Sequence, residues 1–337
     1  MAAGNSYFLG INSDDFFLKD NKKNTGAELY CHRGWMLTKK QFLMRNLHDI
    51  FDLNNSLDHS DHLDIAAECI MDGNIGSANE HLVEMLYGEL ASMMYEVQGN
   101  SFFRFTSLPK QKKGEELSEN PVLKDILTNS LTLSNPSKFN DPMDPILGVW
   151  FDHCRHEQKD SNRLFKLLKD VIDNHLRISC IASSKNDNSM KAVLNPLMWA
   201  HYSCNHKGIC IQYDLSNLIV LSHNNDGQIL RMSDVRYRDH KILNDFITLD
   251  NALLAKAKCW EYEQETRLIY YTKSKLNSDY VTLTGFPIKA IFMGYRISSK
   301  VRDFLKKFVS THNIDLYQMT FLPNNITRMY ARKILDM

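Results

Sequence analysis

Residues 260–271 read WEYEQETRLIYY. The last seven letters, ETRLIYY, form a short aromatic and β-branched run, which is typical of a buried strand. If this strand extends back to residue 263, its period of two places Glu263, Glu265 and Arg267 on one face. The alternative is a solvated edge on which Arg267 pairs with the glutamates and contributes little to stability. We therefore predict a strand whose entrance carries two carboxylates beside a guanidinium.

Other parts of the chain show strand and helix patterns in mixed order. Short apolar runs predict strands at 101–108, 131–134, 176–183, 208–214, 288–295 and 314–319. Apolar residues three and four apart, or start signals such as Pro121 and Ser298, predict helices at 37–53, 82–97, 121–129, 145–175 and 298–309. Because helices and strands do not alternate strictly, we expect an α+β fold with mixed, mainly antiparallel sheets and flanking helices.

The length of the chain favours two units. Its 337 residues exceed the usual size of a single domain. The pattern is mainly helical before residue 100 and mixed after it. We therefore expect a helical N-terminal appendage over residues 1–100 and an α+β domain over residues 101–337.

The composition indicates a globular protein of the cytoplasm. Forty basic residues balance forty acidic ones, so no global field attracts nucleic acid or an anionic membrane. The seven cysteines form no CxxC pair, and the N-terminal residues lack the pattern of an export signal. No apolar run is long enough to cross a bilayer. We expect reduced thiols, a cytoplasmic location and no membrane partner.

A proline-stiffened loop, SNPSKFNDPMDP at 134–145, holds the densest polar cluster. Its candidate ligand-binding residues are Ser134, Asn140, Asp141 and Asp144. Such residues also cap turns by bonding to local backbone groups, and that interpretation accounts equally well for the loop. Loops on rigid scaffolds often hold sites, so the cluster remains a candidate.

A second candidate cluster is Trp199-Ala200-His201-Tyr202. Aromatic rings offer flat surfaces to a planar ligand, and a histidine can exchange protons near neutral pH. On a helix, Trp199 and Tyr202 also have the spacing of residues that are buried together, and we favour a core position for Trp199.

Common site motifs are missing from the sequence. There is no Walker A, GxGxxG, GxSxG or HExxH pattern. No set of histidines and cysteines has the paired spacing of a structural zinc site, and we expect no such metal.

The order of several short motifs resembles a bacterial family catalogued as domain of unknown function twenty-nine seventy-one, some members of which lie near phage-defence genes. The motifs span about residues 101–320, and they are FRF at 103–105, LSNP at 133–136, FNDPMD at 139–144, MWAHY at 198–202, HKG at 206–208, VRY at 235–237, WEYEQETR at 260–267 and IFMG at 291–294. The resemblance implies a shared fold and a role in defence.

The layout also resembles, more distantly, the ADP-ribosyltransferase fold. In that fold an Arg or His on the first strand, a Ser or Tyr in the middle and a late Glu handle NAD. The resemblance implies Arg104, then Ser134 or Tyr202, then Glu265 as catalytic residues, with NAD as the substrate and a protein or nucleic acid as a candidate acceptor. This chain has no Ser-Thr-Ser triplet in the middle position.

Three functional hypotheses remain at this point. The first is an enzyme that cleaves NAD or transfers ADP-ribose, with Glu265 stabilising an oxocarbenium-like transition state. The second is a sensing module that binds a nucleotide or small signal. The third is a nuclease that uses Asp141, Asp144 and Glu265 with a divalent metal.

Overall fold

The computed structural model describes most of the chain from residue 60 onward and a few positions before it. The described residues are 29–32, 35–38, 41, 43–44, 47, 60–93, 97–98, 101–109, 114, 116–141, 144, 159–184, 191–215, 227–238, 249–322 and 325–334.

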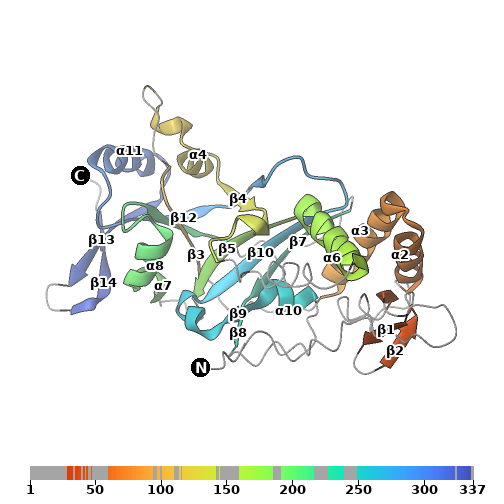
Figure 1. The fold of residues 1–337 in the computed structure, drawn as a ribbon. Helices are drawn as coiled ribbons and strands as arrows, with labels where there is room; N and C mark the ends of the chain where they lie inside the picture. The colour runs from red at the N-terminus through yellow and green to blue at the C-terminus, as the bar shows by residue number, and fades with distance from the viewer. Residues whose placement is uncertain are drawn as a thin grey trace, which may run out of the picture.

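A large sheet forms the centre of the molecule (Figure 1). Its ten strands are β3 (Ser101–Thr106), β4 (Ser130–Ser134), β5 (Leu176–Ser184), β6 (Ile209–Tyr213), β7 (Gln228–Asp234), β10 (Glu265–Thr272), β11 (Tyr280–Thr284), β12 (Ile288–Met293), β13 (Asp315–Leu322) and β14 (Asn325–Lys333). Two small pairs lie outside it, namely β1 (Leu29–His32) with β2 (Trp35–Thr38), and β8 (Arg236–Arg238) with β9 (Ala255–Ala257).

The described helices pack against this sheet or beside it. The α-helices are α2 (Ser60–Asp72), α3 (Ile75–Ser92), α4 (Pro121–Leu127), α6 (Lys159–His175), α7 (Lys191–Leu194), α8 (Pro196–Tyr202), α10 (Leu249–Leu254) and α11 (Ser299–Val309). Three short 3₁₀ helices are η4 (Leu117–Glu119), η5 (Pro136–Lys138) and η7 (Lys258–Glu263).

The order of the main run of strands is β11-β4-β5-β3-β6-β12-β13-β14, and β10 joins β5 to β7. Every described pairing in this sheet is antiparallel except the parallel pair β12 and β13. The predicted α+β class with mainly antiparallel sheets is therefore confirmed.

The sheet is split beside β5. One edge of β5 pairs with β10 along residues 176–182. On the other edge β3 pairs only with the end of β5, as in Phe103 opposite Ala182, and β4 pairs with it only where Ser134 lies opposite Ile178. Two strands thus share one edge and diverge between these points. Among the described residues, positions 179–181 of β5 have no strand partner on that edge, and the sheet opens there.

Helices cover both faces of the sheet, and the alternation of side chains assigns each residue to a face. On one face, Ile181 and Leu268 belong to a core that also contains residues of α4 and α11. On the other face, Ile178 and Ile269 pack with α3, α6 and α10. Farther along that second face, Ala182 packs with α7 and α8.

The polar residues of the second face lie between its two cores. Glu265 is paired with Ala182 and Arg267 with Cys180 in the ladder, so all four side chains leave the sheet on this face. The two separate cores leave room here for a polar site.

The N-terminal helices share a core with the sheet. Leu82 and Leu86 of α3 belong to the same buried cluster as Ile178 and Ile269. The Tyr271 hydroxyl of β10 donates to the Val83 carbonyl oxygen at 2.8 Å. Figure 1 shows α2 and α3 beside α6 at one end of the molecule. The proposed boundary at residue 100 stays a prediction, but these helices are attached to the remainder through buried contacts.

Several predicted elements need new boundaries. The helix predicted at 82–97 is α3, which begins at Ile75 and ends at Ser92. The helix predicted at 37–53 overlaps strand β2 at its start, and most of its length lies outside the described residues. Of the helix predicted at 145–175, residues 145–158 also lie outside them, and the rest is α6. Among the described helices, none combines the length and the apolar character needed to cross a membrane.

Candidate functional site

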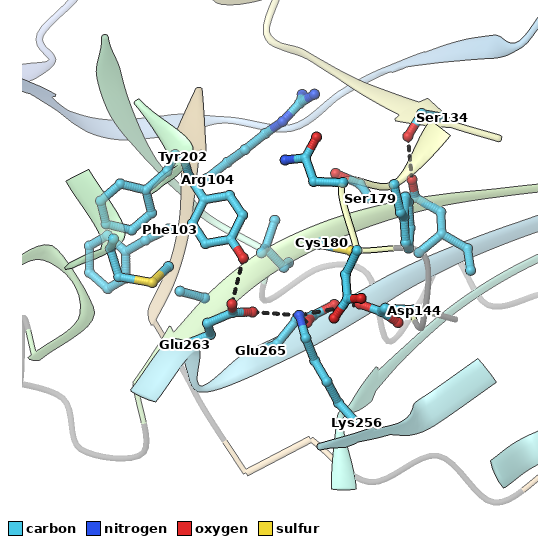
Figure 2. A pocket seen from close by; sticks show the side chains of 18 of the residues that line it. Phe103, Arg104, Ser134, Asp144, Ser179, Cys180, Tyr202, Lys256, Glu263 and Glu265 are labelled. Carbon is cyan, nitrogen blue, oxygen red and sulfur yellow. Dashed lines mark hydrogen bonds and ion pairs between the residues drawn. The ribbon is translucent and has the colours of Figure 1, made fainter. Parts of the chain in front are cut away.

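A polar pocket of about 240 Å³ lies at the split in the sheet (Figure 2). Its walls come from β3, β4, β5, β9, β10, α8, η5, η7 and the loop after η5. The lining residues are Phe103, Arg104, Phe105, Thr132, Ser134, Lys138, Phe139, Asn140, Asp141, Asp144, Ile178, Ser179, Cys180, Ile181, Ala182, Met198, Tyr202, Lys256, Glu263 and Glu265.

A buried cluster of charges forms one end of this pocket. The Lys256 ammonium group lies 2.6 Å from Glu263 Oε2, 2.8 Å from Glu265 Oε2 and 3.2 Å from Asp144 Oδ2. Arg267 lies behind it, donating from Nε to Glu265 Oε1 at 2.7 Å and from Nη2 to Asp144 Oδ1. Three carboxylates therefore share two cations, and the cluster carries an excess of one negative charge when all are ionised.

Glu265 is the fixed charge of this cluster. Burial alone would raise its pKa, but Arg267 and Lys256 outweigh that effect and hold the pKa at about 2. Each of its carboxylate oxygens accepts a hydrogen bond from a cation. Glu265 is 4% exposed and Arg267 is fully buried, so the pair lies in a low-dielectric setting in which losing one partner is costly.

Glu263 behaves differently although it is only two residues away. Burial raises its pKa, and the neighbouring Lys256 only partly offsets this. Its Oε1 atom accepts a hydrogen bond of 2.5 Å from the Tyr202 hydroxyl. Burial also raises the pKa of Tyr202, so the phenol keeps its proton. Glu263 thus takes up a proton more readily than Glu265.

The difference between the two glutamates begins in the backbone. β10 starts at Glu265, whereas Glu263 ends the 3₁₀ helix η7. Gln264, between them, has a left-handed backbone with φ 47° and ψ 51°. The prediction that Glu263, Glu265 and Arg267 alternate along one strand is therefore wrong for Glu263. It holds for Glu265 and Arg267, which lie within β10 and contact each other.

Tyr202 reaches Glu263 because of how α8 begins and ends. Asn195 caps the helix by accepting from the Leu197 N–H, and Pro196 occupies the first turn, where its missing N–H costs nothing. Tyr202 is the last residue of α8. Its side chain lies toward the pocket, and Figure 2 shows the hydroxyl group directed at Glu263.

Arg104 marks the opposite end of the pocket. In the ladder Phe103 is paired with Gln212 and Arg104 with Ile211, so Arg104 leaves β3 on the face opposite to Phe103. Its guanidinium group is 3.9 Å from Asp125 of α4. Figure 2 shows Arg104 extending away from Glu263 and Glu265. Its partner is distant and the split exposes it, so Arg104 can meet an anionic group.

The structure brings most of the sequence-predicted site residues into this one pocket. Those that line it are Arg104, Ser134, Asn140, Asp141, Asp144, Tyr202, Glu263 and Glu265. They come from segments up to 161 positions apart, between 104 and 265. Their placement supports a common site, while their individual roles stay predictions.

Three predicted residues do not line the pocket. Trp199 is fully buried in the core beside α7, where its indole N–H donates to the Val193 carbonyl oxygen at 2.7 Å. His201 is exposed outside the pocket, 2.9 Å from the Tyr262 hydroxyl. Arg267 lies behind Glu265 and supports it. A ligand-binding role for Trp199 is therefore not supported, because its ring is enclosed by protein.

Lys256 is the residue that sequence reasoning missed. It lies in the short strand β9, within an unremarkable ALLAKAK segment. No local pattern marks it, because its three carboxylate partners are supplied by residues 144, 263 and 265. Only the long-range fold could reveal it.

The nuclease hypothesis loses support from the same contacts. It requires Asp144 and Glu265 to hold a divalent cation together with Asp141. In the structure the Lys256 ammonium and the Arg267 guanidinium groups already occupy the space beside Asp144 and Glu265. Within the part of the chain that the structure describes, no group of three or more His, Cys, Asp or Glu side chains is arranged to hold a metal ion.

Comparison with known proteins identifies one family. The sequence profile described as "Protein of unknown function (DUF2971)" matches residues 198–268. This range runs from α8 to β10 and includes Tyr202, Lys256, Glu263, Glu265 and Arg267. No curated protein and no solved structure matches the chain. The predicted family resemblance is confirmed over this segment, which is similar to the DUF2971 family.

Proposed function

We propose that the protein binds NAD in the pocket at the split and cleaves the bond between nicotinamide and ribose. The observation that carries the proposal is the polarity of the pocket. A buried cluster of three carboxylates and two cations, with one excess negative charge when all are ionised, lies at one end, and Arg104 lies at the other. NAD has a cationic nicotinamide ring and an anionic pyrophosphate group, so it matches this polarity in one orientation.

The size of the pocket limits which part of NAD it encloses. Ligand pockets for whole drug-sized molecules usually measure roughly 300–1,000 Å³. The pocket here measures about 240 Å³. It therefore suits the nicotinamide and its ribose, with the pyrophosphate near Arg104 and the exposed Lys138 at the mouth.

The chemistry needs negative charge beside the sugar. When the bond between C1′ and the ring nitrogen breaks, its electron pair leaves with nicotinamide and C1′ becomes an oxocarbenium-like centre. Glu265 keeps its charge at neutral pH because its pKa is held low, and this charge contributes a fixed stabilising field. Water, or a hydroxyl group of an acceptor, then attacks C1′.

Glu263 is assigned the proton transfer in this scheme. Its raised pKa lets it accept the proton that the attacking water or hydroxyl group loses. The Tyr202 hydroxyl group fixes the orientation of the Glu263 carboxylate through the 2.5 Å hydrogen bond. With water as the acceptor, the products are nicotinamide, ADP-ribose and one proton.

The test is nicotinamide release from NAD by the purified chain, followed by chromatography with and without a chelator. We expect metal-independent release, reduced at least about 100-fold in Glu263→Gln. Glu84→Gln on α3 is the matched control, since Glu84 pairs with Lys273 away from the pocket and its loss should leave turnover unchanged. Nicotinamide release that stays absent with RNA or protein acceptors added would refute the proposal.

A binding role without chemistry is the second candidate. Both oxygens of Glu263 and both oxygens of Glu265 already accept hydrogen bonds from protein groups. Carboxylates whose oxygens are all hydrogen-bonded to the protein are compatible with binding a nucleotide as well as with cleaving it. Calorimetry that detects NAD binding to a preparation without turnover would favour this sensing role.

The expected setting of the reaction is the cytoplasm. Five cysteines among the described residues are free thiols, including Cys180 in the pocket wall. Reducing compartments preserve such thiols. A role in antiviral defence, and a protein or nucleic acid as acceptor, rest on the family and fold resemblances.

A further inference from the structure

A second polar cavity of about 420 Å³ adjoins the first one across Glu265. It lies where β5, β7 and β10 come together at one end, beside β8. Its lining residues are Gln98, Ser183, Ser233, Asp234, Val235, Arg236, Tyr237, Leu254, Glu261, Gln264 and Glu265. The NAD scheme uses none of these except Glu265. A volume of this size lies within the range of small-molecule sites.

Two hydrogen-bond donors in the wall of this cavity are not used by the protein. The Tyr237 hydroxyl oxygen accepts from the Glu265 N–H at 2.7 Å, and no acceptor for its own proton is found among the described residues. The Nε atom of Arg236 is buried without a partner, although Nη2 of the same side chain pairs with Asp250. A buried polar group without a partner calls for an explanation, and a ligand is one.

Two carboxylates of the wall, Asp234 and Glu265, already accept hydrogen bonds from protein groups. Asp234 accepts from the Thr266 hydroxyl group at 2.5 Å and from the Gln98 N–H at 2.9 Å. Both oxygens of Glu265 face Arg267 and Lys256. A ligand must therefore bring its own acceptor atoms to meet the two donors.

The charges in the wall disfavour an anion. Asp234 and Glu261 contribute carboxylates, whereas the charge of Glu265 is offset by Arg267 and Lys256, and that of Arg236 is offset by Asp250. A phosphate group would be repelled by this surface. An uncharged molecule with carbonyl or hydroxyl acceptors fits the donors without that repulsion.

We propose that this cavity is a second ligand site, which binds an uncharged nucleoside through the Tyr237 hydroxyl group and the Arg236 Nε–H. A nucleoside carries carbonyl or ring-nitrogen acceptors on its base and hydroxyl groups on its sugar. The site is separate from the proposed NAD pocket but shares the wall formed by Glu265, so occupancy of one cavity can alter the other.

The experiment is a calorimetric titration of the full chain with adenosine, guanosine, cytidine and uridine, and with their 5′-monophosphates. We expect at least one nucleoside to bind with a Kd below about 1 mM, and its monophosphate to bind more weakly. Tyr237→Phe should weaken binding about 5- to 10-fold, the effect of one hydrogen bond. Arg236→Lys keeps the charge beside Asp250 but removes the Nε–H donor, and it should weaken binding to a similar degree.

Tyr202→Phe is the matched control, because it removes a hydroxyl group from the first pocket only. We expect it to leave nucleoside affinity unchanged. Three outcomes overturn the proposal: no nucleoside binding in this range, tighter binding of the monophosphate, or a loss in Tyr202→Phe equal to that in Tyr237→Phe. Nicotinamide release is measured on the same preparations, so a failure of NAD cleavage is distinguished from a failure of nucleoside binding.

Discussion

The two ends of the main pocket are built in opposite ways. At the carboxylate end Lys256 and Arg267 contact Asp144, Glu263 and Glu265 at close range, and all five side chains are buried. At the arginine end Arg104 is partly exposed, and its ionic partner within the described part of the chain is Asp125, 3.9 Å away. The charges at the carboxylate end are therefore paired within the protein, whereas Arg104 at the other end is available to pair with a ligand. The four predictions below test this contrast.

The largest expected effect is on Arg267. We expect Arg267→Met to lower the free energy of unfolding by about 3–5 kcal/mol, because it leaves Glu265 and Asp144 buried with too little positive charge. Urea denaturation at pH 7 measures the loss. Arg104→Met is the matched control, and it should cost less than about 1 kcal/mol because its pair is long and partly exposed. Equal losses in the two variants would erase the contrast between the two ends.

The next effect is the pH dependence of Glu265. Its folded pKa of about 2 lies below the ordinary value of 4.5, so its charge stabilises the fold above about pH 4.5. That stability, about 3 kcal/mol, is lost as the pH falls from about 4.5 to 2. We expect Glu265→Gln to be less stable at pH 7 and to show a flatter profile between pH 5 and 2. Thermal unfolding across this range checks it, and parallel profiles for the two proteins would contradict it.

A smaller effect concerns ligand affinity at the arginine end. If Arg104 meets the pyrophosphate of NAD, Arg104→Met should weaken binding roughly 10- to 100-fold, the usual worth of a hydrogen bond to a charged group. Calorimetric titration with NAD measures the change, and the thermal midpoint should move little. Unchanged affinity would show that Arg104 faces away from the bound ligand.

The smallest effect is on the stability of the Glu263 variant. Because burial raises the folded pKa of Glu263, its charge opposes folding once the pH exceeds the ordinary carboxyl range. At pH 7 we expect Glu263→Gln to keep the wild-type stability or to gain up to about 1 kcal/mol. Urea denaturation measures this free energy of unfolding. A decrease as large as that of Glu265→Gln would mean that both glutamates stabilise the fold.

Local signals explain which parts of the fold could be predicted. The strands β5, β10 and β12 are encoded in continuous β-branched and aromatic runs, and α11 begins with the capping residue Ser298. Most of the site residues, but not Lys256, could be anticipated from the motifs, although one sequence could not place them together. Such elements depend on residues that are close in sequence, so they can be predicted without knowing the tertiary contacts.

The remaining features depend on contacts between distant segments. The amphipathic pattern of α3 shows that one face is buried, but it does not say that the face covers β5 and β10. The left-handed residue Gln264 separates Glu263 from the strand, and a glutamine there gives no warning of that turn. The cationic centre at Lys256 exists only because three segments converge on it. Pairing partners and buried charges of this kind are set by the whole chain.

The shared edge of β5 also has a mechanical consequence. β3 is joined to β6 by five ladder pairs, from Phe102 to Thr106, whereas β4 is joined to β5 by the single pair of Ser134 with Ile178. The two strands that border the opening, β3 and β4, are therefore attached to the sheet by unequal numbers of ladder pairs. β3 is fixed to the body of the sheet by its ladder with β6. β4 carries β11 through five pairs of its own, and it is held beside the opening by one ladder pair and by the packing of Leu131 and Leu133 in the core. The opening is thus bordered on one side by a strand held by a hydrogen-bonded ladder and on the other by a strand held mainly by side-chain packing.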